Sequence, residues 1–264
     1  ALPLFEEALH LAEAGGRGEL AAELAYEMGV TVGTVGDYAR AVEVSLRALE
    51  MFREQQNAYQ EAFCLGNLGC FYCYLGDYPA ALEVLEKAVE LGVELGAPLA
   101  EGSARANLGY ARCALGDIDE ALRLEVAARE VGEAIGDPRL VADACVYEAL
   151  ALLSRESPRE EDLDRARLCA AQALALAEDA GMPGSEAMAQ AAMARAHWLA
   201  GDLAAAETAS QRALTVLEGV GSIEGFESMI QLVHARICLA QGDHEGLRRT
   251  LAWARRELLS KAAW

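Results

Sequence analysis

The chain has 264 residues, of which 42 are Asp or Glu and 22 are Lys or Arg, so its formal net charge is −20. This charge argues against nucleic acid and anionic membrane surfaces as partners of the chain as a whole. Hydrophobic residues make up 53% of the sequence and aromatic residues only 6%, which excludes a disordered chain and favours closely packed helices over sheets.

The first predicted helix covers Leu2 to Leu9 and has the pattern of the second helix of a hairpin, with no first helix before it. We therefore expect the chain to be a piece excised from a larger protein. Beyond this helix, the dipeptide Gly-Asp recurs at intervals of 40, 40, 85 and 41 residues. Its copies are Gly36-Asp37, Gly76-Asp77, Gly116-Asp117, Gly201-Asp202 and Gly242-Asp243.

An alanine about eleven residues after each Gly-Asp pair repeats with the same spacing, and its copy at Ala173 fills the interval of 85. Each period holds two helical patterns, so the repeating unit is a helix hairpin. The sequence predicts one domain over residues 1–264 that is divided into consecutive repeats. Their expected bounds are 1–18 for a partial leading repeat, then 19–57, 58–97, 98–137, 138–182, 183–222 and 223–264.

The unit after Tyr59 illustrates the pattern. Its first helix has an apolar stripe at i, i+3, i+7 and i+10, formed by Leu65, Leu68, Tyr72 and Leu75. Gly76 then permits a tight turn, and Asp77 is expected to cap a second helix whose stripe is Ala81, Leu82, Leu85, Ala88 and Val89. That helix is predicted to end near Gly96, because Pro98 favours the start of the next helix.

Small residues share one phase of every first helix and would let paired helices approach closely. They are Gly29, Gly69, Gly109, Ala149, Ala194 and Ala235. An insertion of about five residues, Ser154 to Pro158, precedes a degenerate copy of the turn at Asp162 to Ala166. The sequence leaves open whether this insertion is a hinge or a contact site.

These residues resemble the tetratricopeptide repeat. The pattern is most complete in the unit that carries Leu68-Gly69, Tyr72, Gly76-Asp77-Tyr78, Ala81-Leu82 and Ala88. The next unit departs from it at Arg112, where the family prefers Tyr, and the later units depart further. The resemblance implies an all-α fold, a right-handed α-solenoid of about six hairpins plus the partial leading repeat.

A period near 40 exceeds the usual 34 of this family. It resembles the long-repeat arrays at the C-terminal end of bacterial signal-transduction ATPases, either LuxR-like activators of the maltose-regulon type or ATPase-linked nucleotide cyclases. Kinesin light chains and bacterial peptide-pheromone receptors are similar to a lesser degree. The resemblance implies a sensor or docking domain in a signalling or transcription-regulating protein.

In such an array the first helices line the concave surface, so the stripe that is not used for packing is expected to face a groove. Stepping by one period along this phase gives candidate partner-binding residues. They are Tyr26, Val30, Asn67, Cys70, Tyr74, Asn107, Tyr110, Tyr147, Arg195, Trp198 and Arg236.

Each type of candidate has two interpretations. The amides of Asn67 and Asn107 could both donate to and accept from a peptide backbone, or they could bind neighbouring helices. The tyrosines could stack on a ligand or pack between helices. Arg195 and Arg236 could hold a carboxylate or phosphate, or pair with nearby acids. The local excess of positive charge from 231 to 264 could meet an acidic surface or be a solvated helix face.

Seven cysteines, most within apolar helical runs, favour a reduced cytoplasmic setting over a disulfide framework. Cys70 and Cys73 form a CxxC inside one predicted helix without further ligands, so we expect no metal. The four histidines are scattered and no phosphate-binding loop is present, so we expect no cofactor and no catalysis. No stretch is apolar for the roughly 20 residues that cross a bilayer.

The sequence favours a non-catalytic module that binds a protein or peptide, or other domains of its own polypeptide. A metabolite sensor that controls an N-terminal ATPase or effector is the second hypothesis, with the tyrosines and Arg195 as ligand contacts. A structural scaffold that self-associates through exposed terminal helices is the third.

Overall fold

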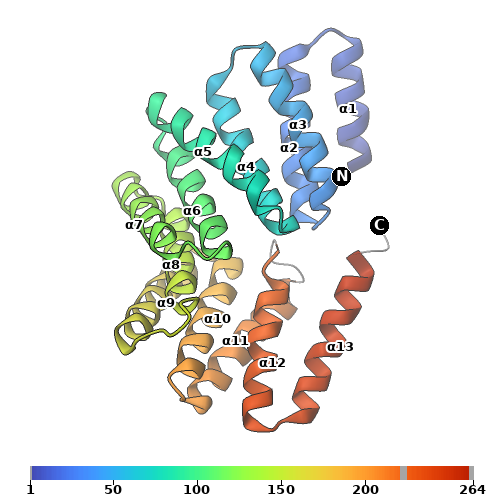
Figure 1. Ribbon diagram of the computed structural model, residues 1–264. Coiled ribbons are helices and arrows are strands. Elements are labelled where there is room, and N and C mark those ends of the chain that lie inside the picture. The colour runs from blue at the N-terminus through green and yellow to red at the C-terminus, as the bar shows by residue number, and fades with distance from the viewer. Residues whose placement is uncertain (1, 221–224, 262–264) are drawn as a thin grey trace. The chain divides into compact units, whose positions relative to one another are not determined.

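The computed structural model describes residues 2–220 and 225–261, the last five of these by their backbone alone. Over these ranges the regular secondary structure consists of 13 α-helices, which confirms the predicted all-α class (Figure 1). The helices are α1 (Leu2–Ala14), α2 (Gly18–Thr34), α3 (Tyr38–Glu54), α4 (Ala58–Leu75), α5 (Tyr78–Glu94), α6 (Pro98–Ala114), α7 (Ile118–Ile135), α8 (Pro138–Leu153), α9 (Glu160–Ala180), α10 (Pro183–Leu199), α11 (Leu203–Val220), α12 (Glu227–Gln241) and α13 (His244–Lys261).

The chain divides into two compact units, residues 1–115 and 116–264. In each unit consecutive helices pack against one another as hairpins. The first helices of successive hairpins also touch, so α4 contacts both α2 and α6 in unit 1, and α10 contacts both α8 and α12 in unit 2. Each unit is therefore a stack of helix pairs in which every pair packs on its neighbours.

The Gly-Asp turns form as predicted. Gly76 ends α4 in the left-handed region with φ of 77°, a conformation that glycine adopts without steric cost. The backbone N–H of Ala80 donates to the carboxylate of Asp77 at 3.3 Å, which caps α5. Asp37, Asp202 and Asp243 cap the helices that follow them in the same way. This short turn makes the two helices of a hairpin antiparallel.

The packing stripes of the hairpin formed by α4 and α5 are confirmed in part: Tyr72, Leu82 and Val89 are only partly buried, and Leu75 is exposed. Leu65, Leu68 and Leu85 are buried between α4 and α5. Leu75, predicted as the last member of the first stripe, is 47% exposed. It is the final residue of α4, where the chain turns away through Gly76 and no longer faces the partner helix.

Small residues bring α4 and α5 close together at Gly69. A Cβ atom at this position would lie 2.3 Å from Cγ of Leu85, so only glycine fits. In unit 2 the same phase is occupied by Ala149 and Ala194, which are fully buried. At Gly69 the spacing of small residues thus correctly predicted a close approach of paired helices.

The proposed repeat bounds remain predictions, and the boundary between residues 222 and 223 lies outside the described residues. The side chains of Glu257 and Lys261, which contribute to the predicted basic C-terminal region, also lie outside them. None of the described helices has the length and apolar character that a membrane crossing requires.

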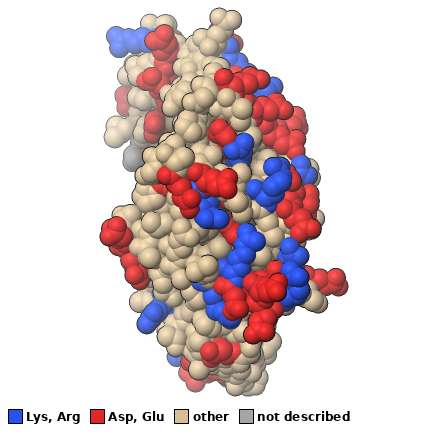
Figure 2. All heavy atoms as spheres, turned by 90° about the vertical axis from the view of Figure 1, so that its left-hand side faces the viewer, with Lys and Arg blue, Asp and Glu red and all other residues tan. Residues whose placement is uncertain are grey.

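Acidic and basic side chains lie next to one another over much of the face shown in Figure 2. Many arginines pair with a carboxylate of the same or a neighbouring helix, as in the pairs of Arg53 with Glu61 at 2.7 Å and Arg112 with Glu86 at 2.6 Å. Exposed pairs of this kind contribute little to stability, at most about 1 kcal/mol each. They nevertheless show which arginines already have a carboxylate partner.

Candidate functional site

The predicted partner-binding residues fall into one set in each unit. In unit 1 they lie on the first helices and are partly exposed, namely Tyr26 and Val30 on α2, Asn67, Cys70 and Tyr74 on α4, and Asn107 and Tyr110 on α6. In unit 2 they are Tyr147 on α8, Arg195 and Trp198 on α10, and Arg236 on α12.

Asn67 is held by a hydrogen bond across two first helices. Its Nδ2 donates to the hydroxyl oxygen of Tyr26 at 3.0 Å. The Tyr26 ring in turn packs edge-on against Phe52, with ring centroids 6.2 Å apart. Burial raises the pKa of Tyr26, while the bond from Asn67 opposes that rise. The bond fixes the orientation of the amide and leaves its carbonyl oxygen as an acceptor on the same face.

Asn107 occupies the equivalent position one period later, on α6. Its side chain is partly exposed and makes no hydrogen bond within the described part of the chain. Glu27, which precedes Asn67 by one period on α2, is exposed. We call the side of α2, α4 and α6 that carries Tyr26, Asn67 and Asn107 the amide face of unit 1. Its polar groups can serve a ligand as both donors and acceptors.

The other aromatic candidates of unit 1 pack within it. The ring of Tyr74 is tilted against that of Tyr38, with centroids 4.9 Å apart. Burial raises the pKa of Tyr110, and the neighbouring Tyr78 and Cys73 add to the rise. Both tyrosines are only partly exposed. They shape the edge of the amide face and present a limited part of each ring to solvent.

Tyr147 in unit 2 is buried, with 8% of its surface exposed. Its ring stacks on that of Phe226, which precedes α12, with centroids 5.9 Å apart and planes 29° apart. The neighbouring first-helix position Leu150 is also buried, as is nearly every residue of α8 from Leu140 onward. Tyr147 therefore offers little of its ring to a ligand in this structure.

The two candidate arginines of unit 2, Arg195 and Arg236, are placed differently. Nη2 of Arg195 donates to the carbonyl oxygen of Leu153, the last residue of α8, at 2.8 Å. Arg236 is exposed, and its guanidinium carbon lies 5.9 Å from the centroid of the Trp198 ring. This distance is typical of a cation–π contact. Arg195 and Trp198 are three residues apart on α10, so they share a face of that helix.

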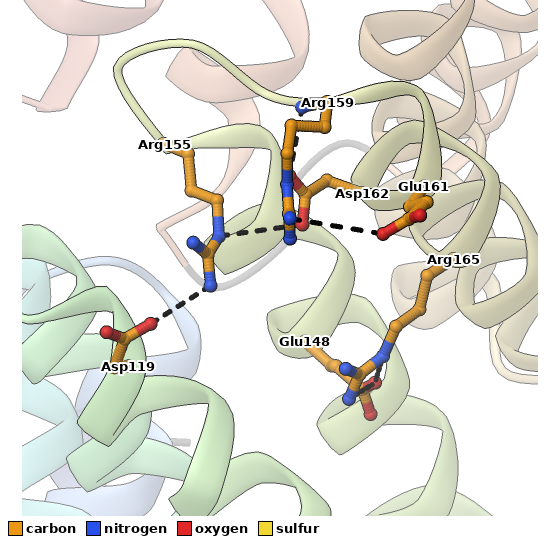
Figure 3. A network of polar contacts seen from close by, with 7 residues as sticks. All are labelled: Asp119, Glu148, Arg155, Arg159, Glu161, Asp162 and Arg165. Atoms are coloured by element: carbon orange, nitrogen blue, oxygen red, sulfur yellow. Dashed lines mark hydrogen bonds and ion pairs between the residues drawn. The ribbon is translucent and has the colours of Figure 1, made fainter.

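The insertion at 154–158 is held by a network of ion pairs (Figure 3). Arg155 bridges the loop to α7 through Asp119, at 2.9 Å, and faces Asp162 of α9 at 3.6 Å. The backbone N–H of Arg159 donates to Asp162, and this bond is the main cause that lowers the pKa of the carboxyl. The loop is thus anchored at both ends, and its arginines are engaged with carboxylates of their own unit.

A second charged cluster lies beneath this loop. Glu148 of α8 is buried, and Nε of Arg165 on α9 donates to it at 2.7 Å. Nε of Arg129 on α7 lies 3.5 Å from the other carboxylate oxygen. Because three helices each contribute one charged group, the cluster fixes the register of α7, α8 and α9.

The cysteines are thiols, mostly buried. Burial raises the pKa of Cys64, Cys145 and Cys169 to about 12 each, which makes them poor nucleophiles. Among the described residues, no three His, Cys, Asp or Glu side chains converge as a metal site would require.

One polar cluster was missed in the sequence. Nδ1 of His234 lies 2.9 Å from Oγ of Ser210, and its Nε2 lies 3.4 Å from Sγ of Cys238. The spacing of His234 and Cys238, four residues apart on α12, indicates that they share a helix face. Ser210 comes from α11, and the 40-residue period gives no hint of it. Burial raises the pKa of Cys238 and lowers that of His234, so both are neutral and the thiol is not activated.

Comparison with known proteins identifies the type of repeat. Residues 20–94 match the tetratricopeptide repeat family. No curated protein matches the chain.

Several solved structures are similar. A Rap protein in complex with competence and sporulation factor has a TM-score of 0.76 at 15% identity, over 99% of this chain and 71% of that one. BtubC from P. vanneervenii has a TM-score of 0.62 at 20% identity, over 83% and 88%. The apo form of the quorum sensor NprR from B. thuringiensis has a TM-score of 0.58 at 14% identity, over 95% and 73%. At these identities the likeness establishes a shared fold. The chain is an array of tetratricopeptide-like helical repeats.

Proposed function

We propose that the chain is a non-catalytic module that binds a protein or peptide on the amide face of unit 1. We further propose that it serves as the sensor or docking domain of a bacterial, cytoplasmic signalling protein. The fold supports a binding role, because this type of repeat is shared with a Rap protein solved with a bound factor and with the quorum sensor NprR. Fold alone does not select a partner, so the proposal rests on the residues of the face.

The observation that carries the proposal is the hydrogen bond between Asn67 and Tyr26. An isolated exposed amide is mobile, and ordering it on binding costs free energy. Because Tyr26 already orients Asn67, most of that cost is removed before a ligand arrives. An extended peptide along the face could donate a backbone N–H to the Asn67 carbonyl and engage the Asn107 amide one repeat later.

The test is a binding measurement with a peptide selected on the wild-type chain from a random heptapeptide display library. Replacing both amides, Asn67→Ala with Asn107→Ala, is expected to weaken calorimetric binding of that peptide by about 1–3 kcal/mol, the cost of lost buried hydrogen bonds. Tyr26→Phe, which keeps the amide but frees it, should give a smaller loss.

Gln172→Ala is the matched control, since it removes an exposed amide from α9 in unit 2. It should bind the peptide like wild type. Circular dichroism must show that all variants keep their helix content. Unchanged affinity in the folded double variant, or failure to select any peptide, would refute the proposal.

A further inference from the structure

Trp198 lies near the end of α10 and contacts Arg236 of α12. It packs against a buried cluster formed by Ala194, Ala206, Ala209, Val233 and Ile237. The residues of this cluster come from α10, α11 and α12. Arg236 lies over this ring, 5.9 Å from its centroid. The stacking restricts the orientation of the guanidinium and lowers the entropy that binding would cost.

Arg236 has no carboxylate partner among the described residues, and its one described side-chain contact is with the Trp198 ring. Two acids on neighbouring segments are engaged elsewhere. Glu207 accepts from Nε2 of Gln241 at 2.9 Å, and Asp243 accepts from the backbone N–H of Gly246 at 2.9 Å. Because the Arg236 guanidinium is exposed and is not engaged by a carboxylate of the described chain, it can pair with an anion supplied from outside.

Arg195 adds a second positive charge to the same side of α10. It lies one turn before Trp198, and its bond to the carbonyl oxygen of Leu153 fixes its position. The surrounding charge also favours an anion here. Residues 201–264 contain 8 acidic and 7 basic residues, whereas residues 1–100 contain 16 acidic and 5 basic ones. An anion is therefore repelled least in the part of the chain that carries Arg236.

We propose that Arg236, seated on Trp198 and supported by the charge of Arg195, binds a carboxylate. A planar guanidinium presents two parallel N–H groups whose spacing matches the two oxygens of a carboxylate. The Trp198 ring lies on one side of the guanidinium, and the exposure of Arg236 leaves it accessible to a ligand. The carboxylate belongs either to a small organic acid or to a peptide, and both sources offer the same group. This site does not depend on the amide face, which lies in the other unit.

The experiment follows the indole N–H signals in an NMR spectrum of the full chain labelled with 15N in its tryptophans. Trp198→Phe identifies the signal of Trp198. Succinate, N-acetyl-trialanine with a free C-terminal carboxylate, its C-terminal amide and inorganic phosphate are titrated separately at constant ionic strength. We expect a saturable shift of the Trp198 signal with succinate or with the free peptide, and none with the amide.

Arg236→Gln is expected to weaken this binding about tenfold or more, because a charge-assisted hydrogen-bond pair is lost. The carboxylate affinity of Arg236→Lys should lie between those of Arg236→Gln and wild type, since lysine keeps the charge but lacks the planar guanidinium. Arg212→Gln, which removes an exposed arginine of α11, is the control for net charge and should bind like wild type.

The carboxylate probe that binds more tightly shows whether the site takes a small organic acid or a peptide C-terminus. The proposal is overturned if no carboxylate gives a saturable shift, if Arg236→Gln binds as wild type does, or if phosphate binds more tightly than both carboxylates. Because Arg236 is exposed, the folded state of the Gln variant can be verified by its unchanged melting temperature. Loss of peptide binding at the amide face would leave this result unaffected.

Discussion

His234 shows how a residue with catalytic potential becomes structural. Ser210 Oγ donates to the carbonyl oxygen of Glu207 at 3.0 Å, so it must accept from Nδ1–H of His234. Nε2 is then the acceptor and faces the thiol of Cys238. The imidazole is satisfied only in its neutral form, and burial is the main cause that lowers its pKa from the ordinary 6.5, against the opposing charges of Glu207 and Asp243.

This arrangement predicts a loss of stability in acid. A folded-state pKa below 6.5 means that, as pH falls through 6.5, the unfolded chain takes up a proton at His234 before the folded chain does. The contribution of His234 to the free energy of unfolding is complete above pH 6.5. Below that pH it declines by at most about 1.4 kcal/mol per pH unit. In His234→Asn the amide can still donate to Ser210 but does not titrate, so the decline should be smaller.

Urea unfolding between pH 8 and pH 5 measures the effect. The exposed His10 on α1 provides the control, because His10→Asn should retain the wild-type slope. A slope in His234→Asn equal to that of wild type would show that the acid sensitivity arises elsewhere.

Among the helices, the contact between α4 and α5 depends on the absence of a Cβ atom at Gly69. A Cβ at position 69 would meet Cγ, Cδ2 and Cδ1 of Leu85 at 2.3, 2.5 and 2.9 Å. Leu85 is fully buried, so it cannot swing aside without opening a gap in the core. The approach of the two helices is therefore set by Gly69.

Gly69→Ala should lower the free energy of unfolding by about 1–3 kcal/mol through overpacking, even though alanine is the better helix former. Gly66→Ala in the same helix is the matched comparison. A Cβ there meets nothing within 4 Å, so this variant should be as stable as wild type or more stable by up to about 1 kcal/mol. Equal effects of the two substitutions on the melting temperature would contradict a steric role for Gly69.

The sequence predicted those parts of the helices that depend on local signals. Gly76 and Asp77 mark a turn because each has a local conformational preference, and these preferences hold in the structure. The exposure of Leu75 and the burial of Tyr147 were not predictable in this way. Both depend on where a second segment lies, the reversed chain after Gly76 in one case and Phe226 in the other.

The candidate site was predictable to a similar extent. The period placed Asn67 and Tyr26 on neighbouring helices, but only the fold shows that their side chains bond. It also placed Arg236 one period from Arg195 without indicating that Trp198 lies under one of them. Repeat spacing therefore locates positions on a face, whereas the partner of each side chain depends on rotamers and on neighbours that differ between repeats.

At the scale of the molecule, the helices that contact one another within each unit, as far as the described residues go, are at most two apart along the chain, as in the contacts of α2 with α4 and α10 with α12. In such an array stability is approximately a sum of hairpin terms and nearest-neighbour terms. A perturbation should then be felt by the hairpin that carries it and its neighbours, and hardly elsewhere.

Gly69→Ala tests this locality when hydrogen exchange is followed by mass spectrometry under native conditions. Peptides from α4 and α5 should exchange faster than in wild type, since their interface is weakened. Peptides from α10 and α11 in unit 2 should exchange at the wild-type rate, and Gly66→Ala should leave both regions unchanged. Equal acceleration of α10 and α11 would mean instead that the whole chain opens as one cooperative unit, and the additive description of the repeats would be wrong.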